Sequence, residues 1–301
     1  MIKLPNFFII GAPKCGTTSL VAWLREHPNV YMSPWKEPRY FDSDLKARFR
    51  ISWSEYKRLY EGASEESIAL GEATVWYLYS KEAIKNIEKK LPGSRYVVLV
   101  RNPVEMAYAL HEQMSCHLAE HVLDFEKAWN LSPLRRKGEK VRPWVLAEPR
   151  MLDYQSVCKV GEQLERLYNQ VPPERVLVLL LDDIKEDTRR EYLKLLDFLN
   201  VPDDNRSNFP VANSAKGVRW RKFQLMLALA MKGERVIKGK LGFPMVNSTF
   251  LKTLNGLNKP ARKRPSLSSN TWNRLVDYYS DDIMKLQNIL ERDLSKWLKK
   301  R

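Results

Sequence analysis

The 301-residue sequence has few cysteines, and their spacing gives them no shared role. Cys15, Cys116 and Cys158 form no C-x-x-C pair, which argues against a structural zinc site and favours the reducing cytoplasm over a secreted scaffold. No run reaches the roughly eighteen apolar residues of a membrane span, and residues 1–10 are too short and too weakly charged for a secretory signal. Internal repeats and low-complexity tracts are also missing. We therefore expect an ordinary globular protein of the cytoplasm.

What the sequence has in excess is positive charge, and this charge is unevenly distributed. The formal net charge is +15. Residues 1–200 hold 30 basic and 28 acidic side chains, whereas residues 201–301 hold 21 and 8. A nucleic-acid binder would account for the total, but the basic residues are not interleaved with an RNA- or DNA-binding motif. We therefore expect no nucleic-acid partner.

Short apolar runs alternate with helical patterns over the first 200 residues. The runs at 6–10 (NFFII), 95–100 (RYVVLV) and 176–181 (VLVLLL) are apolar apart from Asn6 and Arg95 at their starts, as buried parallel strands are. This alternation predicts an α/β fold in which a central parallel sheet is flanked by helices. The length suits a single domain over residues 1–301. The helical patterns occupy residues 16–26, 81–91, 103–120, 150–170 and 188–200.

The turn after the first run is a candidate anion-binding loop. It reads GAPKCGTTSL, so two glycines, the free N–H groups of a helix start and three hydroxyl side chains follow the end of a strand. Gly11 and Gly16 have the spacing of the phosphate loop G-x-x-x-x-G-K-[ST], but Thr17 stands where that loop has lysine. A P-loop kinase or nucleotide-binding protein is the alternative function, and it would also need a carboxylate for Mg²⁺.

The segment from Pro13 to Ser19, PKCGTTS, resembles the 5′-phosphosulfate loop of the sulfotransferases that use 3′-phosphoadenosine 5′-phosphosulfate (PAPS). The resemblance implies a single α/β domain with the P-loop-kinase-like sulfotransferase fold. It also implies that Lys14 reaches the 5′-phosphate and its bridging oxygen. The residues that would bind this end of PAPS are Lys14, Cys15, Gly16, Thr17, Thr18 and Ser19.

Two further segments resemble the parts of that family that bind the 3′-phosphate. The sequence Arg101-Asn102-Pro103 follows the RYVVLV run directly, and the resemblance implies that Arg101 contacts the 3′-phosphate. The family usually has a serine eight residues later, where this chain has Ala109. The later segment KGVR is similar to the family's Lys-Gly-x-Arg element, which folds over the nucleotide. It implies that Lys216, Gly217 and Arg219 add contacts to the 3′-phosphate.

The segment KEPRYF at 36–41 resembles the K-E-P-[HR]-[YF]-F element of the sulfotransferase branch that includes heparan sulfate enzymes and many bacterial members. In that branch the glutamate is the catalytic base, so the resemblance implies this role for Glu37. Ala73 stands where glycosaminoglycan enzymes have a second catalytic lysine. The motifs therefore predict the identity of the donor but only the class of the acceptor. We expect the acceptor to be a hydroxyl of a saccharide, lipid or small metabolite.

The chemistry of sulfuryl transfer explains why such a site carries a lysine and an acid but needs no metal. The reaction resembles phosphoryl transfer, an in-line displacement catalysed by placement and electrostatics, but the transferred group carries less charge. We therefore expect PAPS as co-substrate, adenosine 3′,5′-bisphosphate as product, and no metal ion. His111 is a rival for the proton-accepting role of Glu37, because it follows Arg101 in a cluster with His117 and His121.

The basic last third is expected to fold over the nucleotide and the acceptor. Within residues 201–301, the segment 231–264 contains nine basic residues and a single acid, Glu234. Three interpretations remain open: a solvated basic lid, a site for an anionic, carrier-bound or lipid-linked acceptor, or peripheral contact with an anionic membrane.

Overall fold

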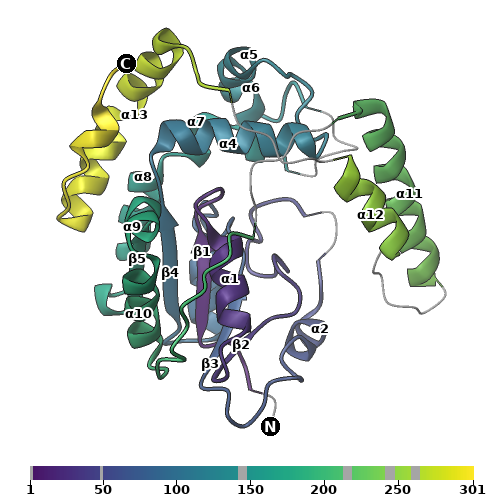
Figure 1. Cartoon of the computed structure of the whole chain (residues 1–301), viewed down its shortest axis with the longest axis vertical. Coiled ribbons are helices and arrows are strands. Elements are labelled where there is room, and N and C mark those ends of the chain that lie inside the picture. Colours follow the sequence, from purple (N-terminus) through teal and green to yellow (C-terminus); the bar gives the residue numbers. More distant parts are fainter. Residues whose placement is uncertain (1–2, 48–49, 142–147, 213–218, 241–247, 259–264) are drawn as a thin grey trace.

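The computed structural model describes residues 3–47, 50–141, 148–212, 219–240, 248–258 and 265–301, and it contains one parallel sheet. The strand order is β2-β3-β1-β4-β5, and helices flank the sheet (Figure 1). The predicted α/β class is confirmed, and the three apolar runs form β1, β4 and β5. The strand bounds are β1 Phe7–Gly11, β2 Val30–Met32, β3 Ala69–Ala73, β4 Arg95–Val100 and β5 Val176–Leu180.

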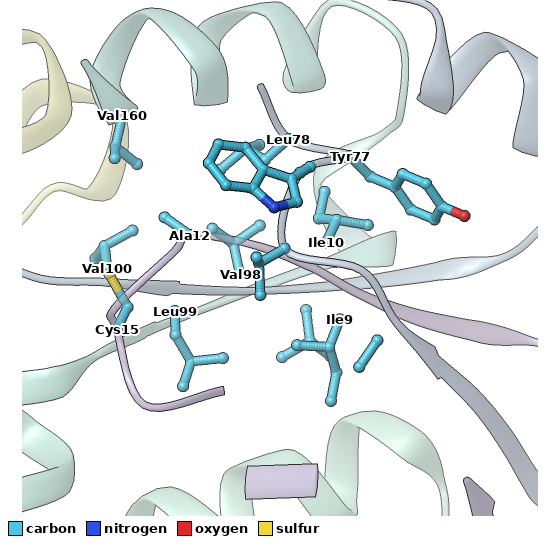
Figure 2. Packing of buried hydrophobic residues seen from close by; sticks show 14 of the residues in the cluster. Ile9, Ile10, Ala12, Cys15, Tyr77, Leu78, Val98, Leu99, Val100 and Val160 are labelled. Atoms are coloured by element: carbon cyan, nitrogen blue, oxygen red, sulfur yellow. The ribbon is translucent and has the colours of Figure 1, made fainter. Parts of the chain in front are cut away.

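Burial explains why these strands are apolar on both faces. Every residue of β1 is buried, as are the last five of β4, because helices cover both sides of the sheet. Figure 2 shows side chains from these strands packed with Cys15, which lies in the turn between β1 and α1. The turn after β1 is thus anchored in the core on one side.

The main helices follow the predicted order. Helix α4 crosses the top of the molecule in Figure 1, α13 lies at one side beyond α8, and the pair α11 and α12 lies at the opposite side. No described helix is long and apolar enough to cross a membrane. The bounds are α1 Thr17–Arg25, α2 Trp53–Arg58, α3 Ala83–Lys90, α4 Pro103–Cys116, α5 Phe125–Asn130, α6 Ser132–Arg136, α7 Tyr154–Val157, α8 Val160–Tyr168, α9 Leu181–Glu186, α10 Thr188–Leu199, α11 Arg221–Lys240, α12 Thr249–Leu257 and α13 Ser269–Leu290.

The helix predicted over residues 150–170 is wrong as a single element. A short 3₁₀ turn is followed by α7 and then by α8. The Asp153 carboxylate caps α7, and the Asp282 carboxylate of α13 accepts hydrogen bonds from the N–H groups of Gly161 and Glu162 at 2.9 and 2.8 Å. These two aspartates satisfy backbone donors that a continuous helix would have bonded internally.

The described parts of the last third take two different courses. Residues 201–212 run along α1, where the Trp23 indole donates to the Pro210 carbonyl at 3.0 Å. We call residues 201–212 the strap. It ends at the turn after β1, where the N–H of Ala212 donates to Ser19 Oγ at 3.1 Å. Helix α13 instead packs on α8 and α4. Folding of residues 201–301 over nucleotide and acceptor therefore stays a prediction, with the strap as the part that reaches the candidate loop.

Candidate active site

The turn between β1 and α1 has the backbone geometry of an anion-binding loop. Gly16 caps α1 with φ 98°, a left-handed conformation that suits glycine, and a Cβ there would lie 3.2 Å from Leu181 Cδ1. Lys14 is also left-handed, with φ 65°. The first N–H groups of α1 have no partner inside the helix, and the helix dipole is positive at this end. The loop therefore presents donors to an anion beyond the strand.

Lys36 lies against this loop, although our sequence analysis did not select it. Its Nζ donates to Thr18 Oγ1 at 2.8 Å, and burial lowers the pKa of the Lys36 ammonium below its ordinary value. The contact brings a second lysine to the first turn of α1. Lys36 is the first residue of the KEPRYF segment, in which we assigned a role only to Glu37.

Glu37 is held beside Lys36 by its own backbone. Its N–H donates to the Ala73 carbonyl at 2.9 Å, at the carboxyl end of β3, and its φ is 62°. A non-glycine residue in this region is strained, and such strain often marks functional sites. The carboxylate Oε1 lies 3.8 Å from Lys36 Nζ, and burial raises the pKa of the Glu37 carboxyl above its ordinary value. The predicted base is therefore next to the predicted phosphate loop.

The strand end that carries this contact rests on a buried acid. Glu72 accepts hydrogen bonds from Tyr56 OH and Thr74 Oγ1, both at 2.6 Å, and it is fully buried. Burial raises the pKa of the Glu72 carboxyl to about 7. Ala73 is itself buried. Ala73, at the position where glycosaminoglycan enzymes have a second catalytic lysine, therefore gives the site no polar side chain. In this chain Lys36 supplies a second lysine to the site.

Arg101 joins the second predicted element to the loop. Its Nη1 donates to the Lys14 carbonyl at 3.2 Å, and its Nη2 is bonded to Glu105. Its Nε is buried and has no hydrogen-bond partner among the described residues. Asn102 caps α4, accepting from the N–H groups of residues 104 and 105, with Pro103 in the first turn. The Arg-Asn-Pro segment thus forms the predicted helix start, with its arginine against the loop.

Several predicted binding residues contribute through their backbone or lie elsewhere. The Cys15 thiol is fully buried, and burial raises its pKa to about 12, so only its backbone is available to an anion. The N–H of Arg219 donates to the Asn258 carbonyl at 2.9 Å, and its exposed guanidinium lies over the Trp220 ring. Lys216 and Gly217 lie outside the described residues. The 3′-phosphate roles of these last three residues stay predictions.

His111 occupies a buried position within the helical layer. Its Nε2 is hydrogen-bonded to the Val122 carbonyl at 2.9 Å, and its ring packs edge-on against Phe125 and Tyr154. Burial lowers the pKa of its imidazole. It lies about 12 Å along α4 from the start of that helix. Its described contacts are with the core and not with the loop, and its catalytic role stays a prediction.

The site therefore brings four segments together at the start of α1. They are the loop with Lys14, the Lys36–Glu37 pair, the Arg101 turn and the strap that ends at Ala212. Among the residues that the structure covers, no three His, Cys, Asp or Glu side chains are grouped as metal ligands would be. The arrangement provides cations and N–H donors for an anion, with one carboxylate beside them.

The sequence model of the sulfotransferase domain family matches residues 4–214, more than half of the chain. The chain belongs to the sulfotransferase domain family. It is 24% identical, over 99% of its length and 31% of the relative's, to a human bifunctional heparan sulfate N-deacetylase/N-sulfotransferase 3. It is 33% identical, over 35% of its length and 22% of the relative's, to the membrane-associated sulfotransferase kil1 of Dictyostelium discoideum. The chain thus spans about a third or less of these relatives.

A solved sulfotransferase from Alicyclobacillus acidocaldarius has the same fold, with a TM-score of 0.72 over 99% of this chain and all of the other. The two sequences are 22% identical, so this likeness concerns the fold. Together with the family match, it confirms the resemblance that the PKCGTTS segment suggested. The roles of individual site residues stay predictions.

Proposed function

We propose that this sulfotransferase moves a sulfuryl group from PAPS to an acceptor hydroxyl and releases adenosine 3′,5′-bisphosphate. The observation that carries the proposal is the hydrogen bond between Lys36 and Thr18, because it fixes the segment of the base against the phosphate loop. Family membership supports the reaction type. A kinase would require lysine at the position of Thr17, and no contact in the site favours that alternative.

The proposed mechanism assigns each charged group near the loop one task. Glu37 accepts the proton of the acceptor hydroxyl while the hydroxyl oxygen forms a bond to sulfur. The bond from sulfur to the bridging oxygen breaks, and the electron pair remains on the phosphate, where Lys14 stabilises it. Lys36 contacts the peripheral oxygens of the transferred group. Arg101, whose guanidinium lies against the loop and donates to the Lys14 carbonyl, binds the 3′-phosphate.

We propose a saccharide, lipid or small metabolite as the acceptor, and the cytoplasm as the place where the reaction occurs. The name of the human N-deacetylase/N-sulfotransferase supports a saccharide, and that of a second human relative, heparan sulfate glucosamine 3-O-sulfotransferase 6, supports a hydroxyl. Ala73 differs from the glycosaminoglycan pattern. The experiment is incubation with PAPS and a panel of hydroxylated metabolites. Mass spectrometry should find one sulfuryl group added to a product together with adenosine 3′,5′-bisphosphate. ATP-dependent phosphorylation without any PAPS-dependent product would contradict the proposal.

Lys36→Met is expected to lower kcat about 10- to 100-fold, because it removes a preorganised cation from the transferred group. The affinity for PAPS should fall less, since Lys14 and Arg101 remain. Initial rates at saturating PAPS and a calorimetric titration measure the two effects. Lys85→Met is the matched control, because Lys85 is exposed on α3 and pairs with Glu82 at the surface. Equal behaviour of the two variants would remove Lys36 from the mechanism.

A further inference from the structure

The pair α11 and α12 carries its apolar side chains on the outside. On α11, Leu225, Met226 and Leu229 are 48%, 66% and 60% exposed. On α12, Phe250 and Leu257 are about as exposed. Their spacings of three, four and seven residues place them on one face of each helix. We call these five residues the outer stripe. A soluble surface seldom groups so many large apolar side chains.

The buried face of the pair combines one apolar residue, Leu227, with a network of polar side chains. Gln224 Nε2 donates to Asn255 Oδ1 at 2.8 Å, and Asn258 Nδ2 donates to Gln224 Oε1 at 3.0 Å. Glu234 accepts two hydrogen bonds from the N–H of Ser248, at 2.9 and 3.0 Å. The two helices are thus joined by amides and a carboxylate. The five residues of the outer stripe remain exposed and available to another partner.

The charge of this region selects the partner. Helix α11 contains six basic residues and one acid, Glu234, which bonds inward to Ser248. By sequence, residues 219–264 contain twelve basic residues and that single acid. A combination of exposed apolar side chains and strong positive charge suits a surface with acyl chains beneath phosphates. A nucleic acid or a sulfated saccharide would leave the outer stripe in water.

The pair is also placed where a flat surface can reach it. In Figure 1 it stands at the side of the molecule opposite α13. Helix α11 begins nine residues after Ala212, the residue whose N–H donates to Ser19 in the phosphate loop. A surface that covers the outer stripe would therefore contact a helix that follows the candidate site closely in the sequence.

We propose that α11 and α12 bind the surface of an anionic phospholipid bilayer. The outer stripe enters the boundary between headgroups and acyl chains, and the excess of basic residues in this part of the sequence favours an anionic surface over a neutral one. Residues 222–229 lie outside the catalytic machinery, so the proposal is independent of sulfuryl transfer. Either could fail without the other.

The test is co-sedimentation of the full chain with two kinds of vesicle, phosphatidylcholine alone and phosphatidylcholine with phosphatidylserine. We expect binding to the anionic vesicles, weakened by salt, and little binding to the neutral ones. The triple variant Leu225→Glu, Met226→Glu, Leu229→Glu should lose at least about tenfold in affinity. Met284→Glu is the matched control, because Met284 is a 53% exposed apolar residue of α13. It should bind as the unmodified chain does.

Three results would overturn the proposal. The first is no preference for anionic vesicles. The second is equal loss of binding in the triple variant and in Met284→Glu, since the outer stripe would then have no special part. The third is a stable dimer by light scattering that the triple variant dissociates, because a second copy would then cover the stripe. Circular dichroism and a thermal melt of the triple variant, compared with those of the unmodified chain, show whether the variant is folded.

Discussion

Replacing Glu37 by glutamine is expected to lower kcat about 10²- to 10⁴-fold, the usual contribution of a positioned general base. The variant keeps the size of the side chain and the backbone hydrogen bond to Ala73, which is 2.9 Å long. The ability to accept the acceptor's proton is lost, together with the negative charge that lies 3.8 Å from Lys36 Nζ. Binding of PAPS should therefore persist in a calorimetric titration while initial rates at saturating PAPS collapse. Glu165→Gln, on the exposed face of α8, is the control and should retain full activity.

The rival assignment is decided by the same assay applied to His111→Ala. His111 is buried and bonded to the Val122 carbonyl, so its loss should lower thermal stability more than kcat. If His111→Ala abolished turnover in a folded protein while Glu37→Gln remained active, the roles would be exchanged.

The pH profile of kcat gives a second signature of Glu37. Burial raises its pKa above the ordinary 4.5, and a base works only when it is deprotonated. Activity should thus fall as the pH drops through this raised pKa, and the acid limb should be missing from the residual activity of Glu37→Gln. On the alkaline side, burial lowers the pKa of Lys36, so its charge is lost earlier than that of an ordinary lysine. Lys36→Met should remove that limb.

The sheet was predictable where strands are fully buried and not where they are short or mixed. Strands β1 and β4 appear in the sequence as apolar runs because both of their faces are covered. Strand β5, at the edge of the sheet, is also an apolar run, although Leu177 and Val178 are only partly buried. Strand β2 has three residues, VYM, and no such run. Strand β3, ALGEA, was noticed only through its resemblance to a family segment, because its buried Glu72 interrupts the apolar pattern. A polar residue satisfied by Tyr56 and Thr74 cannot be recognised without the fold.

The site was predictable as separate segments, but its decisive contacts were not. The loop, the Arg101 turn and Glu37 each have a local motif, and the structure places all three at the start of α1. The contact between Lys36 and Thr18 joins a residue beyond β2 to the first turn of α1, so it depends on how the chain returns over the loop. The break in the helix at 150–170 likewise depends on Asp282, which is distant in sequence.

Lys14→Ala is the second change for which we expect a very large effect, a loss of about 10²- to 10³-fold in kcat, typical for removal of one preorganised group that stabilises developing charge. Lys14 lies three residues after the end of β1, and Arg101 donates to its carbonyl at 3.2 Å. The strand and this hydrogen bond together position the backbone that carries the Lys14 side chain. The affinity for PAPS should fall less than kcat, because the negative charge on the leaving phosphate grows as the bond to sulfur breaks.

The φ of 65° at Lys14 requires a control for backbone strain, because alanine tolerates this conformation poorly. Asparagine adopts it readily and has no charge, so Lys14→Asn separates the two causes. If charge is what matters, Lys14→Asn is as inactive as Lys14→Ala, and Lys14→Arg recovers part of the rate, limited by its larger planar head. An active Lys14→Asn variant would show instead that the loop needs this residue for its backbone alone, and stabilisation of the leaving phosphate would then have to come from the N–H groups at the start of α1.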